Sequence, residues 1–306
     1  MNLFDRSRVN HCASFLTGVL LVLPWLEPWA PAPLPNVVPL LISWTCIGLL
    51  MASGQRLQAR DIARAWAMAA VVSSAMGLVQ YFGLADVFSP WVHVPDYLGE
   101  ARANLRQRNQ LATLTAMGIL AVLWWASNGL QRPHALWMLA LIATGNAATN
   151  SRTGLLQMLL VTVLVLGWSL AHRSNRERLP WRLVLCALGL YACAAWALPH
   201  FLSMSSGADT ISALTRMGHD DGCGSRKVLW RNVLELIAQK PWWGWGWDEL
   251  KYAHYSASYS GERFCEILGN AHNGPLQLAF ALGVPVATLI TLGLIMITLA
   301  LRPWRP

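Results

Sequence analysis

Charge is scarce in this sequence. Only 12% of its 306 residues are charged, whereas 55% are hydrophobic, and soluble domains usually carry about 25% charged residues. The sequence also lacks a Gly-x-Ser-x-Gly nucleophile elbow, a Walker-type phosphate loop and a convincing metal-ligand spacing of His, Cys and carboxylates. The composition therefore argues against a soluble globular chain, and the motifs give no support to serine-hydrolase, nucleotide or metal chemistry.

Long apolar runs take the place of these signals. A helix needs about 20 mostly apolar residues to span a membrane, and no strand-type alternation competes with the runs. The sequence predicts an all-α integral membrane protein with about eight transmembrane helices. The predicted spans are residues 12–30, 34–52, 62–84, 111–127, 134–149, 154–171, 183–200 and 274–301.

The first span also has features of a cleaved signal peptide. A basic start precedes an apolar core, and Ala30-Pro31-Ala32 imitates a cleavage site. Pro33 would directly follow the cut, which is unfavourable, and seven further spans come after it. We therefore interpret this span as a retained helix.

Basic residues set the predicted orientation. With the N-terminus inside, the inner segments are strongly basic and the outer ones nearly balanced, as membrane topology requires. The clearest case is the short connection that holds Arg173, Arg176, Arg178 and Arg182. The formal net charge of +8 is thus a topology signal rather than a footprint of nucleic-acid binding, and the expected surroundings are a lipid bilayer.

Three predicted connections lie outside, at residues 85–110, 150–153 and 201–273. Connections as long as the last are usually functional. Cys223 and Cys265 both lie in it, and an oxidising compartment would allow a disulfide between them; two free thiols are the alternative. The other four cysteines lie in spans and are interpreted as packing residues.

Polar residues cluster on the outer side at two of these connections. The stretch Asn104-Leu105-Arg106-Gln107-Arg108-Asn109 offers donors for diphosphate or sugar hydroxyls; a solvated loop with basic membrane anchors is the plain alternative. Arg152 follows Asn150-Ser151 between two apolar spans, close to the hydrocarbon boundary. An arginine at such depth indicates function, unless it only extends to the headgroups.

The long connection holds two further patterns. Residues 225–239 have the pattern of an amphipathic helix on which Arg226 and Trp230 share a face; it could bind an anion through Arg226 or lie on the membrane surface. The tryptophan-rich residues 241–247 would follow as a turn, with most of the tryptophans at the interface and some able to stack on sugars.

A histidine lies at the end of the same connection, within Asn270-Ala271-His272-Asn273. An unperturbed imidazole titrates near neutral pH, so His272 can accept a proton from a hydroxyl. A structural histidine at a helix start is the alternative, and His254 is a competing candidate for the same role.

In this order, the clusters resemble the O-antigen ligase/polymerase superfamily of bacterial membrane glycosyltransferases, with a GT-C-like architecture. Within it, the chain is most similar to PglL-type O-oligosaccharyltransferases, which glycosylate pilins and other exported proteins. The resemblance covers roughly residues 99–290. It rests on residues 99–113, Ser151-Arg152-Thr153-Gly154, residues 226–230, 241–246 and 270–273, and Leu276-Gln277-Leu278 with Leu282-Gly283-Val284-Pro285.

The resemblance implies residue roles. His272 corresponds to the functional histidine, and Arg152 and Arg226 to the arginines that hold the lipid diphosphate. Polar contacts to the donor glycan or the acceptor are expected from Arg106, Gln107, Asn109, Asn270 and Asn273. The implied donor is an undecaprenyl-diphosphate-linked oligosaccharide and the acceptor a pilin-like exported protein, with no metal or other cofactor. The protein would lie in the bacterial inner membrane, with a cytoplasmic N-terminus and a periplasmic active site.

The expected organisation has three parts: the first three spans with the start of the first loop at 1–98, a catalytic region at 99–301, and a cytoplasmic tail at 302–306. The family usually carries further helices after the histidine, so a fragment, a truncated gene or a short variant is expected here. Two alternative functions stay open. One is an O-antigen ligase to lipid A-core or an O-antigen polymerase; the other is a non-catalytic scaffold or a lipid-carrier transporter, although polar residues gathered on the outer side favour chemistry there.

Overall fold

The computed structural model describes residues 3–28, 37–53, 58–95, 98–171, 180–206 and 222–301, with backbone alone for 3–14, 205–206 and 301. The chain divides into two compact units, Met1–Gly218 and His219–Pro306. This division falls inside the predicted 201–273 connection. The predicted tail at 302–306, Ala30-Pro31-Ala32 and most of the basic connection at 173–182 lie outside the described residues.

Unit 1 is a bundle of α-helices. Across the ranges given above, the chain contains no strand. Four described helices, α3, α4, α6 and α7, are long and apolar enough to cross a membrane. The all-helical class is confirmed, and eight crossings stay a prediction. The helices of unit 1 are α1 (Leu3–Leu26), α2 (Val37–Ala52), α3 (Ala59–Tyr81), α4 (Arg108–Ser127), α5 (Arg132–Ala148), α6 (Arg152–Ala171) and α7 (Trp181–Ser206).

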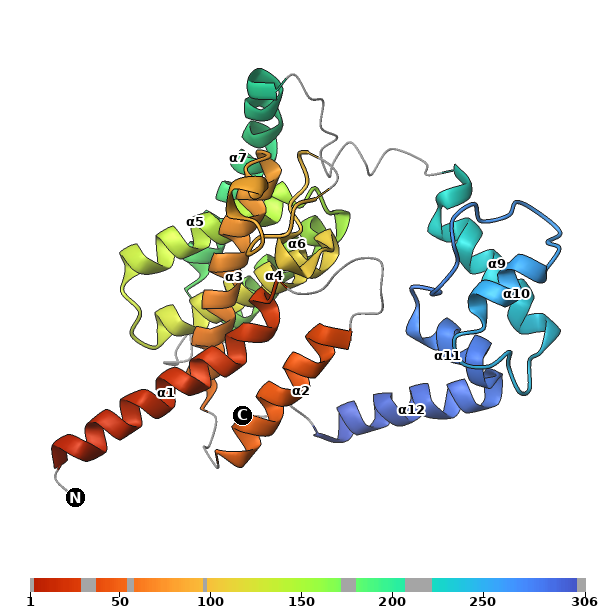
Figure 1. The fold of residues 1–306 in the computed structure, drawn as a ribbon, viewed down its shortest axis with the longest axis horizontal. Helices are drawn as coiled ribbons and strands as arrows, with labels where there is room; N and C mark the ends of the chain where they lie inside the picture. Colours follow the sequence, from red (N-terminus) through yellow and green to blue (C-terminus); the bar gives the residue numbers. More distant parts are fainter. Residues whose placement is uncertain are drawn as a thin grey trace. The chain divides into compact units, whose positions relative to one another are not determined.

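Helix α3 lies at the centre of unit 1, where it packs against α1, α4 and α5 (Figure 1). Small residues allow these helices to approach closely. A Cβ on Gly118 of α4 would overlap Ala70 of α3, and a Cβ on Gly145 of α5 would overlap Ser74. Close backbone packing of this kind is typical of membrane helices, since it maximises van der Waals contact.

In unit 2, three short helices pack around a core of their own: α9 (Arg226–Gln239), α10 (Leu250–Ser256) and α11 (Gly274–Leu282). The longer α12 (Val284–Leu301) follows them. The amphipathic helix predicted at 225–239 is confirmed as α9. Ser225 caps it by accepting the Val228 N–H (3.4 Å). Its apolar face packs in the core of unit 2, against residues that include Phe264 and Phe280. The helix therefore covers a protein core with its apolar face, and a membrane-surface position of its basic residues stays a prediction.

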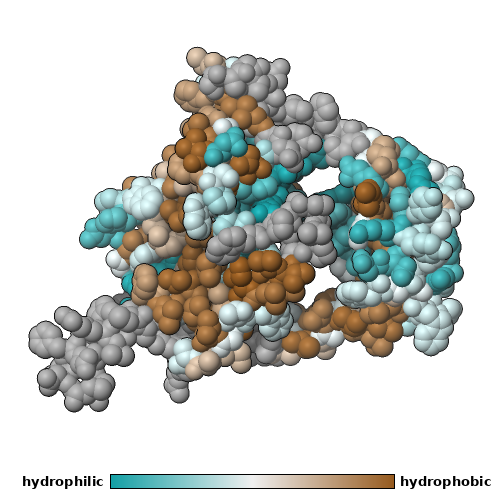
Figure 2. Space-filling model, in the orientation of Figure 1, coloured by the Kyte–Doolittle hydropathy of each residue, from teal (hydrophilic) through white to brown (hydrophobic). Residues whose placement is uncertain are grey.

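The span predicted at 274–301 is not one continuous helix, because the helix breaks at Gly283. This residue adopts φ 85°, a left-handed conformation that favours glycine. A Cβ here would collide with the carbonyl of Trp242, and the next N–H, of Val284, donates to the Pro241 carbonyl (2.8 Å). Helix α12 beyond the break carries exposed apolar side chains, whereas hydrophilic side chains predominate over α9 and α10 (Figure 2).

The tryptophan turn, residues 240–247, fastens the end of α9 to α11. The N–H groups of Trp245 and Gly246 donate to the carbonyls of Phe280 and Ala281 (2.8 and 3.1 Å). The Trp245 ring lies parallel to Phe280, and its indole N–H donates to the Leu236 carbonyl (2.8 Å). Three other tryptophans of the turn are largely exposed, namely Trp242, Trp243 and Trp247.

Candidate active site

Gln80 on α3 organises the loop between α3 and α4, called here the first loop (residues 82–107). Its side chain is fully buried. It donates to the carbonyls of His93 and Ala103 (2.7 and 3.1 Å) and accepts the N–H groups of Arg102 and Ala103 (2.9 and 2.6 Å). One amide thus satisfies four backbone groups, which fixes the start of the predicted polar motif.

Asn104 has a structural role. It is 5% exposed and donates to the carbonyls of Leu26 and Trp91 (2.7 and 2.9 Å) while accepting the His93 N–H (2.9 Å). Arg106 donates to the Pro28 carbonyl (2.9 Å). Burial lowers the pKa of the Arg106 guanidinium, and the charge of Glu27 opposes that shift. Both motif residues therefore tie the first loop to the end of α1.

Glu100 pairs two arginines of the motif. Its carboxylate accepts from Arg102 Nε (2.8 Å) and from Arg108 (2.9 Å), and its side chain is only 11% exposed. One carboxylate thus offsets part of the positive charge of two guanidinium groups, one in the first loop and one at the start of α4. This role was missed from sequence, where Arg108, as part of the stretch from Asn104 to Asn109, was interpreted as a donor for a ligand.

The serine–arginine turn, residues 149–152, is fastened to the first loop. Asn150, with φ 48°, donates to the Gly99 carbonyl (2.8 Å). The Ser151 hydroxyl donates to Asn109 Oδ1 (2.7 Å) and accepts the Gly154 N–H (3.2 Å). The structure thus brings together two clusters that lie about 40 residues apart in sequence, as the 42-residue separation of Asn109 and Ser151 records.

Two predicted ligand contacts of unit 1 stand at helix starts. Gln107 is exposed in the residue before α4, and Arg152 is the half-buried first residue of α6. The first turn of a helix leaves its N–H groups without intrahelical partners and carries a partial positive charge. This end of unit 1 can therefore attract an anion.

In unit 2, the histidine loop, residues 270–273, holds an exposed imidazole on a fixed backbone. His272 has φ 50°, a conformation that costs free energy for a residue with a Cβ. Its N–H donates to Asn270 Oδ1 (2.8 Å). Within the described part of the chain, its ring has no hydrogen-bond partner, and it is exposed.

The residues on either side of His272 are bound tightly. Ala271 is fully buried; its N–H donates to Gln277 Oε1 (2.8 Å), and its carbonyl accepts from Trp230 Nε1 (3.0 Å). Asn273 caps α11 by accepting the Leu276 N–H (3.3 Å). The loop thus presents the imidazole outward while its backbone is held from both ends.

Arg226 is the exposed first residue of α9. A disulfide joins Cys223, three positions before it, to Cys265. The bonded pair is the one that the sequence analysis singled out. It connects the start of α9 to the segment that leads to the histidine loop.

His254 has a structural role instead. It is 6% exposed, and its Nε2 lies 3.2 Å from the Phe264 carbonyl, which can only accept. Nδ1 must then accept the Tyr259 hydroxyl proton at 2.6 Å. Burial lowers the pKa of His254 and raises that of Tyr259 to about 12. Both groups are neutral and mutually bonded, so His254 is a poor candidate for a proton acceptor.

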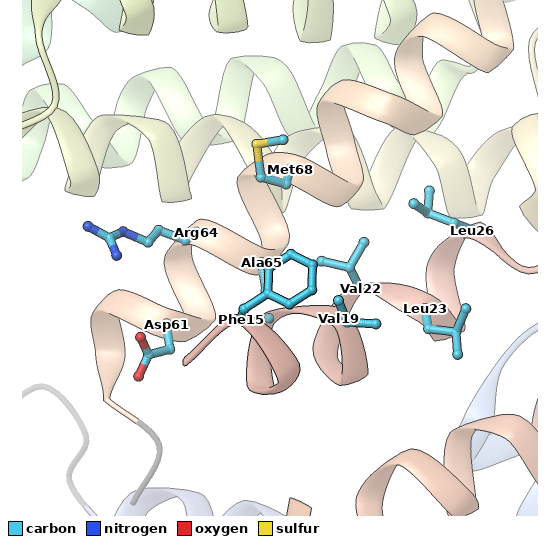
Figure 3. A pocket seen from close by; sticks show the side chains of 10 residues that line it. Phe15, Val19, Val22, Leu23, Leu26, Asp61, Arg64, Ala65 and Met68 are labelled. Carbon is cyan, nitrogen blue, oxygen red and sulfur yellow. The ribbon is translucent and has the colours of Figure 1, made fainter. Parts of the chain in front are cut away.

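Figure 3 shows an apolar groove of about 550 Å³ between α1 and α3. Phe15, Val19 and Leu23 line it from α1, and Met68 from α3, with Asp61 and Arg64 as its charged residues. None of the predicted site residues lines it. Among the described residues, no group of His, Cys, Asp and Glu is placed to hold a metal ion.

The fold and these clusters define a class. The O-antigen ligase family matches residues 137–291, and the chain belongs to that family. The protein glycosylation ligase family matches residues 101–126, which include the whole polar stretch from Asn104 to Asn109. The combination of the two matches confirms the resemblance to PglL-type enzymes and, with the apolar helices, a membrane protein.

One curated relative is a general O-oligosaccharyltransferase of Acinetobacter baylyi. It is 27% identical over 233 residues, which cover 73% of this chain and 39% of the relative. The chain therefore aligns with about two fifths of that protein's length. No solved structure matches the chain.

Within each unit, the structure brings part of the predicted site together: Asn109, Ser151 and Arg152 in unit 1, and the Arg226 helix with the histidine loop in unit 2. The sequence analysis did not assign roles to Gln80, Glu100 and Gln277. Gln80 bonds backbone groups 13 to 23 positions away, whereas the partners of Glu100 and Gln277 lie two to eight positions away. None of these pairings has a signal in the sequence. Trp230 was noticed only for its spacing from Arg226.

Proposed function

We propose that this protein transfers a preassembled oligosaccharide from undecaprenyl diphosphate to Ser or Thr hydroxyls of exported proteins such as pilin. The observation that carries the proposal is His272, exposed on a backbone that hydrogen bonds hold in a left-handed turn. A group held in this way loses little freedom when it meets a substrate. The match of residues 101–126, the end of the first loop and most of α4, to protein glycosylation ligases supports a protein acceptor.

The proposed reaction is a direct displacement at the anomeric carbon. The acceptor hydroxyl oxygen bonds to that carbon, and the bond from the carbon to the diphosphate oxygen breaks. The hydroxyl proton passes to His272, and the electron pair leaves with the lipid diphosphate. A single displacement inverts the anomeric configuration, and the reaction uses no metal ion.

Arg152 and Arg226 would stabilise the leaving diphosphate. Each is the first residue of a helix, α6 or α9. A guanidinium there combines its planar fork of donors with the positive end of the helix dipole. Charge that develops on the leaving group is thereby stabilised. Gln107, Asn109, Asn270 and Asn273 would contact glycan or acceptor hydroxyls in the same proposal.

The second candidate is transfer to lipid A-core or to a growing O-antigen chain. The O-antigen ligase match over residues 137–291 favours it. A non-catalytic scaffold or a lipid-carrier transporter is the third candidate. Neither function requires an exposed histidine on a backbone held by hydrogen bonds. All three place the protein in the bacterial inner membrane, with the site on the periplasmic side.

The test is the intact mass of a co-expressed pilin in a host that lacks its own ligase and makes a known lipid-linked glycan. We expect a glycan-sized mass increase that His272→Ala abolishes. An unmodified pilin with a new lipopolysaccharide ladder on a gel would instead support the ligase. If neither signal appears although the protein is in the membrane, the transferase proposal is wrong for this chain.

A further inference from the structure

Two side chains converge on the backbone of one residue, Ala271, which precedes His272. Trp230 comes from α9 and Gln277 from α11 (Figure 1). Trp230 Nε1–H donates to the Ala271 carbonyl (3.0 Å), and Gln277 Oε1 accepts the Ala271 N–H (2.8 Å). Both polar groups of this buried residue thus depend on side chains rather than on regular secondary structure.

This arrangement bears directly on the histidine. His272 follows Ala271 and adopts φ 50°, which is disfavoured unless its surroundings impose it. Ala271 is fully buried, and buried backbone groups are nearly always hydrogen-bonded, so loss of either side chain leaves one of its groups without its partner. Without either bond, the loop gains freedom at the residue that aims the imidazole.

Trp230 also links His272 to the arginine helix. It lies one turn after Arg226 on α9, and residues four apart lie on the same helix face. Two further side chains of α9 bind the segment that precedes the histidine loop. Arg231 and Asn232 both donate to the Glu262 carbonyl (3.0 Å in both cases). A side-chain bond from α9 therefore fixes where the histidine loop lies relative to the start of that helix.

We propose that Trp230 and Gln277 are positioning residues that aim His272 and set its placement relative to Arg226. The inference rests on the proposed function, because it assigns His272 a reacting partner. Neither residue touches the substrate. Their effect is on turnover through the imidazole, not on donor affinity.

The chain offers matched controls for both residues. Trp230→Phe removes the N–H and keeps most of the ring. Trp245→Phe makes the same change in unit 2, at a half-buried tryptophan whose Nε1–H donates to the Leu236 carbonyl (2.8 Å), away from the histidine loop. Gln277→Leu removes the acceptor oxygen at similar volume, whereas Gln277→Glu keeps an acceptor for the Ala271 N–H.

The experiment measures glycan transfer by the purified full chain, with kcat and the KM for lipid-linked donor determined separately. A misplacement of about 1 Å can cost about 100-fold in rate, so we expect Trp230→Phe and Gln277→Leu to lower kcat about tenfold or more. The KM for donor should stay within about twofold, since only the imidazole is displaced. Trp245→Phe and Gln277→Glu should keep the wild-type kcat.

A second readout does not depend on activity. In protein labelled with ¹⁵N at histidine, the His272 ring signals are identified by their absence in His272→Ala. We expect Trp230→Phe and Gln277→Leu to shift or broaden those signals, and Trp245→Phe and Gln277→Glu to leave them in place. If the unmodified chain transfers no glycan, the proposed function fails, and the ring signals still decide whether the two residues position the histidine.

Three results would overturn the inference. One is wild-type kcat and unchanged ring signals in both Trp230→Phe and Gln277→Leu. Another is Gln277→Glu as impaired as Gln277→Leu, which would mean that packing rather than the acceptor oxygen matters. The third is an equal loss in Trp245→Phe, which would indicate a general loss of stability. Should Trp230→Phe fail to fold, the Gln277 pair decides alone.

Discussion

In unit 1, the polar residues of the first loop bind one another and the backbone, whereas in unit 2 the backbone of the histidine loop is bound and the imidazole points outward. Glu100 forms ion pairs with Arg102 and Arg108, and the Asn104 side chain makes three hydrogen bonds to backbone groups. His272 has its backbone N–H fixed by Asn270 and its side chain exposed. A polar motif can thus mark a scaffold in one region and a reacting group in another.

The sharpest test of this comparison sets one histidine against another in unit 2. His272→Ala should lower glycan transfer by at least about 100-fold, since positioned general bases contribute roughly 10²–10⁴, and should leave thermal stability unchanged. His254→Ala should do the reverse, because it removes a buried side chain bonded at both nitrogens. Transfer assays and thermal unfolding of both purified variants check this. Equal loss of transfer with equal stability in the two variants would contradict it.

The disulfide should dominate the stability of unit 2. The bond closes a segment of 42 residues, for which loop-closure entropy gives about 4 kcal/mol. Cys223→Ser with Cys265→Ser should therefore lower amide protection of residues 222–283 in hydrogen exchange, while unit 1 helices keep theirs. The unmodified protein under reductant is the control and should match the double variant. Unchanged protection in unit 2 would show that its core suffices.

Glu100→Gln should weaken unit 1 moderately. It removes the charge that two arginines share in a mostly buried position, at a cost of about 1–2 kcal/mol. Thermal unfolding should reveal the loss, and added salt should lower the wild-type stability toward that of the variant. If Glu100→Gln instead raised donor affinity with stability intact, Arg102 and Arg108 would be ligand contacts that Glu100 restrains.

The smallest expected effect is a pH dependence of unit 2. Burial lowers the pKa of His254 below its ordinary value near 6.5. Below that ordinary value the unfolded state binds a proton that the folded state resists, so stability is full above it and falls as pH drops toward the folded pKa. Hydrogen exchange of residues 250–268 between pH 7.5 and pH 5 measures this. Tyr259→Phe, which removes the proton donor to Nδ1, should alter the slope, and a flat profile in the wild type would contradict it.

The sequence predicted helices far better than hydrogen-bond partners. Apolar runs located α3, α4, α6 and α7 to within a few residues, because lipid-spanning segments must be continuous helices. The sequence did not predict the break at Gly283, because the requirement for glycine there comes from the carbonyl of Trp242, 41 positions away in the chain. The same limit explains Asn104, whose partners include the carbonyl of Leu26, 78 residues away. An asparagine that the sequence predicts to contact a ligand can instead hold distant backbone segments together by hydrogen bonds, as Asn104 does.

The tryptophan turn also limits which substitutions this sequence can accept. A Cβ at Gly244 would lie 2.6 Å from the backbone of Ala281, and Gly283 faces the carbonyl of Trp242 from the other side of the same junction. Two backbones touch there with no side chain between them. In a library of single substitutions, we expect positions 244 and 283 to accept glycine alone for a folded unit 2, while the exposed Trp243 beside them accepts many residues. The exposed Trp243 is therefore replaceable, whereas Gly244 of the turn and Gly283 opposite it are required for unit 2 to fold.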